Sequence, residues 1–253
     1  MNMLKKKKII SAILITPLVI LAGLVVFILW PLIMLFARLL DSSEKAPNTI
    51  SRWGLSFLSF VSGVGLTVEG RENFDKKQQY LILANHKSAI DIPVLARILP
   101  FHFKFFASNR FFYIPFFGWG MALAGYIPVN RASRIKSYKA VQKGINILSR
   151  SQASLLIFPE GTRIEEDKIE RFKQGFLHIA TKSQKPMLPV VLEGTLEIKK
   201  KKERLFYPGR VRVSILPPVP STGLTKDKWP QLRQELEKKF QEEYARLLTL
   251  RSD

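Results

Sequence analysis

Apolar residues are concentrated near the amino terminus, where Ile9–Trp30 runs for 22 residues without a charge. From there to Leu40 the only charged residue is Arg38, and Lys5–Lys8 form a basic cluster before the apolar stretch. About 20 apolar helical residues are enough to cross the hydrocarbon core of a bilayer. A helix that is apolar on all sides is typical of lipid surroundings, although a buried soluble helix is an alternative. The pattern therefore predicts a membrane-embedded segment over residues 1–40.

The topology of this segment is open to more than one interpretation. A cleaved signal peptide fits poorly, because the apolar run is longer than about 7–15 residues and no small-residue cleavage site follows it. Lysines before a single span would send the remaining chain outside, whereas the Lys and Arg content of that chain favours the cytoplasm. Pro17 and Pro31 interrupt the segment and can bend it. We expect it to enter the membrane and return, leaving the rest on the cytoplasmic face (of the inner membrane, in a bacterium).

Residues 41–65 separate this segment from the rest of the chain. Residues 41–50 are mostly polar and predict a linker. Trp53–Gly65 mixes apolar with small residues, which indicates an interfacial helix. We therefore divide the chain into a membrane-embedded segment (1–40), a linker with an interfacial helix (41–65) and one further domain (66–253).

The domain over residues 66–253 alternates short β-like runs with helical patterns. The predicted strands are Leu66–Gly70, Tyr80–Ala84, Ile127–Val129, Ser154–Phe158, Met187–Leu192 and Val211–Leu216. The predicted helices are Ile92–Leu99, Ser133–Ser149, Gln174–Lys182 and Gln231–Leu248, the last with Leu232, Leu236, Phe240, Tyr244 and Leu247 at helical spacing. This alternation predicts an α/β fold, in which helices flank a mostly parallel central sheet.

Charge and composition narrow the classes of function. The chain has 253 residues, a net charge of +20 and 47% hydrophobic residues. That combination favours a protein on anionic lipid, with nucleic acid as the other usual partner of so basic a chain. There is no cysteine, which excludes disulfides, thiolate zinc sites and cysteine nucleophiles. With three histidines, a histidine-rich metal site is not expected.

His86 and Asp91 are five positions apart, between a predicted strand and a predicted helix. On one continuous helix their side chains would point roughly 140° apart, so they meet only if the histidine precedes the helix and the aspartate opens it. The carboxylate would then hold one ring nitrogen as N–H and leave the other to accept a proton. Alternatively, Ser88-x-x-Asp91 is a capping box that needs no chemistry. Ser88 as a nucleophile is disfavoured, because the glycines of a nucleophile elbow are missing.

A second polar motif, Phe-Pro-Glu-Gly-Thr-Arg, occupies residues 158–163 at the end of a predicted strand. In open α/β sheets ligands bind at the carboxyl ends of strands. Gly161 lets the backbone approach a phosphate closely, and Arg163 can grip two phosphate oxygens. Glu160 is better placed to accept hydrogen bonds from a hydroxyl or to brace an arginine. A polar turn with a surface ion pair is the alternative.

The ordered set of motifs resembles the glycerolipid acyltransferase family, whose best-known bacterial members acylate 1-acylglycerol-3-phosphate. The resemblance covers roughly residues 66–195. It rests on His86 with Asp91, on the Phe-Pro-Glu-Gly-Thr-Arg motif, and on further blocks at Ile114–Gly118 with Gly125, Val129–Arg131, Phe172–Gly175 and Leu188–Val191.

The resemblance implies a reaction and a set of residue roles. His86 would be the general base on the acceptor hydroxyl, and Asp91 would orient it. The phosphate-binding residues would be Glu160, Gly161, Thr162, Arg163 and Arg131. The hydroxyl would attack the thioester directly, without an acyl-enzyme, a metal or a bound cofactor. The co-substrate would be acyl-CoA or an acylated carrier protein.

Some positions depart from the family pattern. Ser108 and Arg110 stand where the second block often has a lysine and a glutamate, and Ile164 and Asn130 replace a common serine and a common acidic residue. Lys104, one helical turn before Ser108, is a candidate accessory cation, as is Lys173. These departures bear on the identity of the acceptor.

Two other segments attract attention. Phe101–Trp119 is rich in aromatic residues but too short and too charged to span a membrane. We expect most of its rings in the core, with an interfacial surface or the wall of an acyl channel as alternatives. The lysine run Lys199–Lys202 predicts a solvated surface, and His102 and His178 are expected to be structural.

The preferred prediction is a membrane-bound enzyme that esterifies the sn-2 hydroxyl of 1-acylglycerol-3-phosphate and yields phosphatidic acid. A rival within the class uses another lysophospholipid or a lyso-aminolipid as acceptor. Two rivals from other classes are a membrane-tethered nucleic-acid-binding protein, whose motifs would be coincidental, and a serine hydrolase. Under the preferred prediction the partners are the bilayer, the lysophospholipid and the acyl donor, and no nucleic acid.

Overall fold

The computed structural model describes residues 3–40, 45–130 and 132–251. Its strands are β1 (Val64–Glu69), β2 (Leu81–Ala84), β3 (Phe103–Ser108), β4 (Ile127–Val129), β5 (Ser154–Ile157), β6 (Met187–Glu193) and β7 (Gly209–Ile215). Its α-helices are α1 (Met3–Leu40), α2 (Lys45–Val61), α3 (Asp91–Ile98), α4 (Asn109–Phe112), α5 (Phe117–Leu123), α6 (Arg134–Arg150), α7 (Gly175–Ser183), α8 (Thr195–Ile198) and α9 (Trp229–Thr249). Short 3₁₀ helices cover Arg71–Asn73 and Lys226–Lys228.

The strands form one seven-stranded sheet in the order β1-β7-β6-β2-β5-β3-β4. All neighbours run parallel except β6 and β7, which pair antiparallel. Every residue of β2 and β6 is buried, as expected for central strands covered by helices on both faces. The predicted mostly parallel α/β sheet is therefore present.

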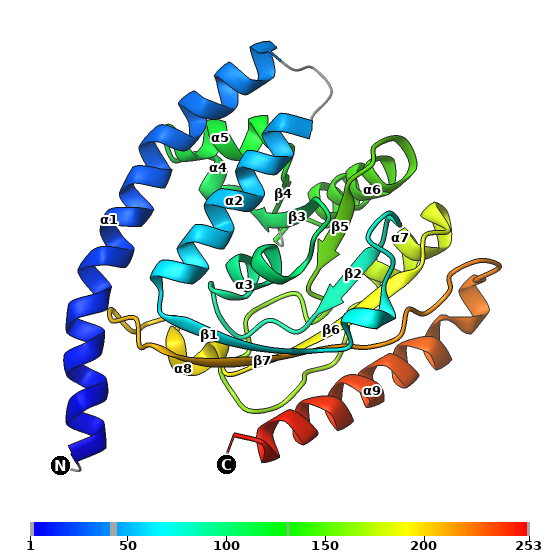
Figure 1. Ribbon diagram of the computed structural model, residues 1–253. Helices are drawn as coiled ribbons and strands as arrows, with labels where there is room; N and C mark the ends of the chain where they lie inside the picture. Colours follow the sequence, from blue (N-terminus) through cyan, green and yellow to red (C-terminus); the bar gives the residue numbers. More distant parts are fainter. Residues whose placement is uncertain (1–2, 41–44, 131, 252–253) are drawn as a thin grey trace.

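Helices cover both faces of the sheet (Figure 1). On one face Val94 and Leu95 of α3 pack with Ile82 and Val190 of the strands. On the other face helices α6, α7 and α9 cover a second hydrophobic cluster, to which α9 contributes Leu236. The predicted closing helix is thus confirmed, with Leu236, Phe240, Tyr244 and Leu247 buried and Leu232 partly buried.

Helix α1 is continuous from Met3 to Leu40, with Pro17 and Pro31 inside it. The expectation that the chain turns back at these prolines is therefore wrong, because one helix continues through both of them. A proline removes one hydrogen bond from a helix. Apolar helical turns before and after each proline maintain α1 across the missing bond. Helix α2 runs back alongside α1 (Figure 1).

The boundaries of α2 also differ from the prediction. Residues 45–50, expected within a polar linker, are helical, and residues 41–44 lie outside the described residues. The helix expected over Trp53–Gly65 ends at Val61, because β1 begins at Val64. Apolar residues spaced along α2 pack against the domain, among them Ile50 and Leu55, and this packing draws the preceding residues into the helix.

The aromatic segment Phe101–Trp119 divides into β3, α4 and α5, none of which the pattern predicted. Phe101 and Phe105 are buried in the core, and Phe103, Phe106, Phe112 and Phe117 are partly buried against it. Phe111, Tyr113, Phe116 and Trp119 are exposed. One face of β3 combines Lys104 and Ser108 with Phe106, and this apolar residue breaks the alternation of polar and apolar positions.

Candidate active site

The loop between β2 and α3 carries His86, and Asp91 is the first residue of α3. The Nδ1 atom of His86 lies 2.8 Å from Oδ2 of Asp91. Because a carboxylate only accepts hydrogen bonds, Nδ1 must carry the proton, which leaves Nε2 as the acceptor of the ring. The structure thus brings the pair together in the arrangement that the spacing required.

Asp91 is fully buried and also organises the loop backbone. Its Oδ2 accepts from the backbone N–H groups of Lys87, at 2.8 Å, and Ser88, at 2.9 Å. The second of these bonds is half of the capping box, whereas the Ser88 hydroxyl instead donates to the carbonyl of Lys199 at 2.6 Å. The carboxylate therefore both holds the loop before α3 and orients the imidazole.

Asn85 determines where the loop begins. Its side-chain amide donates to the carbonyl of Leu192 and its amide oxygen accepts from the Leu192 N–H, both at 2.8 Å. These bonds imitate a strand pair and continue the contact between β2 and β6 one residue past Ala84. His86 is consequently presented at the carboxyl end of the central strand.

Glu160 follows β5 and lies directly behind the histidine loop. Its Oε2 accepts from the backbone N–H of His86 at 2.8 Å, and its Oε1 accepts from the N–H of Glu170 at 3.2 Å. Burial raises the pKa of this carboxyl to about 7. A further bond runs from the N–H of Ile164 to the carbonyl of His86, 2.9 Å. The two motifs are therefore joined backbone to backbone, and Glu160 braces the histidine loop.

The imidazole ring is also held by stacking. Phe158, at the end of β5, lies parallel to it, with ring centroids 3.9 Å apart and planes 13° apart. The His86 side chain is 13% exposed, so one edge of the ring stays accessible. Stacking and the bond to Asp91 together restrict both torsions of the side chain.

The other predicted phosphate-binding residues lie in the loop that follows. Gly161 has φ +77°, which favours glycine, and a Cβ there would come 2.9 Å from the side chain of Lys173. Thr162 and Arg163 line the same cavity as His86. Arg131 lies outside the described residues.

The candidate accessory lysines are placed differently. Lys173 lies over Gly161, beside the motif. Lys104 is buried on β3, with its Nζ directed at Gly125, and it is not among the residues that line the cavity.

A cavity of about 390 Å³ begins at His86 and runs between the sheet and helices α1, α2 and α5. Its polar end is formed by His86, Thr162, Arg163 and Lys201. Its walls are largely apolar and include Trp30, Leu55, Leu58, Ile92, Pro93, Phe105, Phe111, Phe117, Met121, Tyr126 and Phe158. A proton acceptor, a guanidinium and a long apolar pocket are thus adjacent, an arrangement suited to an amphiphile with an anionic head.

Residues 65–193, about half of the sequence, match the family described as "Acyltransferase". The chain belongs to the acyltransferase family. The resemblance given by the motifs is therefore confirmed, and the nucleic-acid-binding and serine hydrolase alternatives no longer explain them.

Characterised acyltransferases with related sequences or structures support this assignment. The 1-acyl-sn-glycerol-3-phosphate acyltransferase of Saccharomyces cerevisiae is 33% identical over 196 residues, which cover 77% of this chain and 64% of that enzyme. The alpha enzyme of the same name from Homo sapiens is 31% identical over 72% of this chain and 65% of its own length. The chain thus spans somewhat less than two thirds of these relatives.

One solved structure is similar over nearly its whole length. It is the 1-acyl-sn-glycerophosphate acyltransferase from Thermotoga maritima, 27% identical, with a TM-score of 0.79 over 95% of this chain and 97% of that one. The match includes the helices that precede the sheet, since so little of either chain is left out. The predicted fold class is confirmed by this likeness.

Several residues of this acyltransferase site were not predicted. Lys87 is buried, and its Nζ donates to the carbonyls of Glu166, at 2.7 Å, and Lys168, while it lies 4.8 Å from the centroid of the Tyr244 ring. Burial lowers the pKa of Lys87, against the attraction of Glu160 and neighbouring carboxylates. This lysine ties the loop after the second motif to the first.

Trp30 and Lys201 are the other unpredicted cavity residues. Trp30 ends the apolar amino-terminal run, and only the packing of α1 on α5 shows that its ring faces the cavity. Lys201 belongs to the run expected to be a solvated surface. Among the residues that the structure describes, no three His, Asp or Glu side chains are grouped so that they could hold a metal ion.

Proposed function

We propose that this protein is a 1-acylglycerol-3-phosphate O-acyltransferase, which transfers a fatty acyl group from a thioester to the sn-2 hydroxyl and yields phosphatidic acid. The observation that carries the proposal is the His86–Asp91 pair at the polar end of an apolar cavity that Arg163 also lines. Relatives and the similar solved structure bear names of the same activity.

The proposed reaction starts at Nε2 of His86. This nitrogen takes the proton of the acceptor hydroxyl as its oxygen attacks the thioester carbonyl. Asp91 stabilises the imidazolium that forms, because its carboxylate accepts the Nδ1–H bond. The tetrahedral intermediate then breaks its C–S bond, the new C–O ester bond remains, and the imidazolium returns the proton to the leaving thiolate.

The two ends of the cavity would bind the two ends of the lipid. Arg163 matches phosphate in geometry and charge, and the backbone at Gly161 and Thr162 permits close approach. The apolar walls would hold an acyl chain, with about 0.8 kcal/mol gained for each buried CH₂. Head and chain together place the hydroxyl between them, near His86.

The same amphiphile requires access from a membrane. Within the described residues, Ile9–Leu39 of α1 is long and apolar enough to span a bilayer, by length and composition. We propose that 1–40, with the amphipathic α2 of 41–65, embeds in the membrane, and that the domain of 66–253 lies at the cytoplasmic face and takes acyl-CoA or acyl carrier protein as donor. Since the chain has no cysteine, single cysteines at Lys5 and Ser252 can be tested for labelling from either side. Labelling of the second from outside contradicts the cytoplasmic placement.

The activity itself can be measured as thiol release from acyl-CoA in liposomes that contain 1-acylglycerol-3-phosphate. Because the enzyme has no cysteine, a thiol reagent reports only the liberated coenzyme. Acceptor-dependent release supports the proposal. Other lysophospholipids and a lyso-aminolipid are tested in parallel, each with acyl-CoA and with acyl carrier protein as donor. Thiol release with one of these acceptors, and none with 1-acylglycerol-3-phosphate, makes that lipid the acceptor instead.

A further inference from the structure

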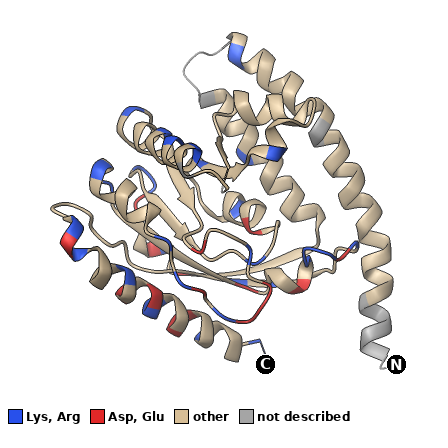
Figure 2. Ribbon diagram, turned by 180° about the vertical axis from the view of Figure 1, so that it is seen from behind, with Lys and Arg blue, Asp and Glu red and all other residues tan. Residues whose placement is uncertain are grey.

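The lysine run Lys199–Lys202 is held against both motif loops of the site. The carbonyl of Lys199 accepts from the Ser88 hydroxyl at 2.6 Å, and the backbone N–H of Lys201 donates to the carboxylate of Glu165. Figure 2 shows the run as a blue stretch of the loop that leaves α8. Both anchoring residues lie within two positions of His86 or Arg163, so the loop is positioned by the site rather than loose on the surface.

The same loop is fastened at its other end to the amino-terminal helix. The backbone N–H of Phe206 donates to the hydroxyl of Thr16 on α1, at 2.9 Å. Lys199 lies 5.2 Å from the centroid of the Phe206 ring. The loop that carries the lysines is therefore bonded to α1 at one end and to the two motif loops at the other.

In the part of the chain that the structure describes, the polar end of the cavity is lined by cations and by no acidic side chain. Of the described residues that line the cavity, Arg163 and Lys201 are the two with a permanent positive charge, and none is Asp or Glu. Burial lowers the pKa of Lys199, and repulsion from Arg163 contributes in the same direction. Cations held this close together are stabilised when an anion lies between them.

We propose that Lys201 is the second cation of the headgroup site, where it binds the phosphate of the acceptor together with Arg163 and sets the preference for a phosphate-bearing lipid. This inference rests on the proposed function. A phosphate monoester carries about −1.5 to −2 charges at neutral pH, as phosphorylated side chains do. One guanidinium cannot balance that charge, and a lysine on a flexible stem adds a movable ammonium group.

The test compares full-length Lys201→Ala with wild type in liposomes, with acceptor and acyl-CoA varied separately. We expect the KM for 1-acylglycerol-3-phosphate to rise about tenfold, as the loss of one partly exposed charge-assisted contact would give. The kcat and the KM for acyl-CoA stay within twofold. Lys201→Arg keeps the charge and restores most of the affinity.

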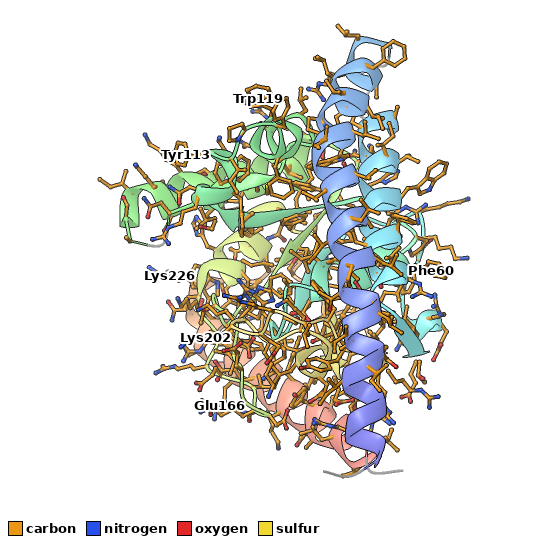
Figure 3. All side chains as sticks on the ribbon, turned by 90° about the vertical axis from the view of Figure 1, so that its left-hand side faces the viewer. Phe60, Tyr113, Trp119, Glu166, Lys202 and Lys226 are labelled. Carbon is orange, nitrogen blue, oxygen red and sulfur yellow. The ribbon has the colours of Figure 1, made fainter. Side chains whose placement is uncertain are left out.

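Lys202→Ala is the matched control, because Lys202 is exposed in the same run but does not line the cavity. Figure 3 labels it on the side of the molecule that also carries Glu166. It should leave both KM values unchanged. An equal rise in the KM for 1-acylglycerol-3-phosphate in Lys202→Ala and Lys201→Ala overturns the inference. Such a result would mean that the basic surface attracts the lipid in general and that Lys201 makes no specific contact.

The phosphates of coenzyme A are the other source of the same chemistry. A rise in the KM for acyl-CoA alone assigns Lys201 to the donor and overturns the inference. Unchanged KM values in an active Lys201→Ala enzyme overturn it while leaving the proposed function intact. A wild-type enzyme that releases no thiol with 1-acylglycerol-3-phosphate, from either donor, overturns both.

Discussion

At the scale of single residues, the site shows one histidine held by several different kinds of contact. His86 is bonded to Asp91, stacked on Phe158, and fixed through its backbone by Glu160 and Ile164. A histidine that is so restricted loses little rotational freedom when a substrate arrives, which suits the proposed role of a general base. The His86 side chain is thus one part of a larger rigid loop.

His86→Ala should lower kcat by about 10²–10⁴-fold, the usual contribution of a general base. The protein should remain folded, because the Asp91 bonds to the Lys87 and Ser88 backbone persist. The measurement is thiol release together with thermal unfolding in the same detergent. His178→Ala, a change on α7 away from the cavity, serves as the control. Normal turnover by folded His86→Ala would falsify the mechanism.

Glu160 makes a prediction about pH. Burial raises its pKa from 4.5 to about 7, so the folded protein keeps a proton that the unfolded chain loses. Glu160 therefore contributes its whole share to the free energy of unfolding below pH 4.5. This contribution falls as the pH rises from 4.5 to about 7, by at most about 1.4 kcal/mol per pH unit.

The comparison is the free energy of unfolding in urea for wild type and Glu160→Gln, at several pH values in one detergent. The difference between them should change between pH 4.5 and 7. Glu235→Gln, at an exposed position of α9, should follow wild type throughout. A Glu160→Gln curve parallel to wild type would contradict the assignment of the shift to this carboxyl.

The residue types of the site were readable from the sequence, but several of their contacts were not. The spacing of His86 and Asp91 required a turn followed by a helix, and the structure has both. That Glu160 accepts from two backbone N–H groups could not be predicted, because residues 86 and 170 come together only through the pairing of β2 with β5. Lys201 was hidden for a similar reason, since a lysine run has no periodicity that shows which residue faces a cavity.

At the scale of elements, the contact between α1 and α5 forms part of the cavity wall. Trp30 packs on α5 so tightly that a Cβ at Gly120 would lie 2.7 Å from its ring. The ring also approaches Phe117 and Tyr126, with centroids 6.0 and 6.3 Å away. The amino-terminal helix is consequently part of the pocket wall.

Gly120→Ala should lower the free energy of unfolding by about 1–3 kcal/mol, because the methyl group forces the tryptophan aside. It should also change the preference among acceptors with acyl chains of different length. Gly23→Ala on α1 is the matched control, since nothing lies within 4 Å of its Cβ position. Gly23→Ala should leave the free energy of unfolding unchanged or raise it by up to about 1 kcal/mol, because alanine favours a helix more than glycine does. Equal stability and chain preference in both variants would rule out the tight contact.

The sequence predicted the elements with clear periodicity or short apolar runs, such as α6, α9, β4 and β6, to within one or two residues. It did not predict β3, because Phe106 shares a face with Lys104 and Ser108 and breaks the alternation of polar and apolar residues. Nor did it show that α1 passes through Pro17 and Pro31. Whether a proline ends a long helix depends on tertiary packing, which a local pattern does not contain.

At the scale of the whole molecule, the two amino-terminal helices present a large apolar surface. Along α1 large apolar side chains are exposed from Ile10 to Leu39, and Trp53, Phe57 and Phe60 extend this character to α2. In Figure 3, α1 runs along the molecule, with Tyr113 and Trp119 labelled towards its carboxyl end. At about 57 Å, α1 is longer than a hydrocarbon core of about 30 Å is thick.

These surfaces predict a particular response to salt. The full chain should bind phosphatidylcholine vesicles, and bind faster when phosphatidylglycerol is present, because the net charge is +20. Once bound, it should float with the vesicles in about 1 M salt, where charges are screened beyond about 3 Å. Release by salt alone would show that charge, not the apolar surface of α1, holds the protein to the membrane.

The two hydrophobic clusters of the domain differ in how they are completed. Helices α6, α7 and α9 close one of them, whereas Trp30, Phe105, Met121 and Tyr126 of the other face the cavity. An acyl chain in that cavity would fill the place of a core side chain. A ligand at about 100 times its Kd adds about 2.7 kcal/mol to the free energy of unfolding. The fraction of protein that is folded would therefore depend on the concentration of lysolipid. A membrane with little lysolipid would contain fewer folded molecules.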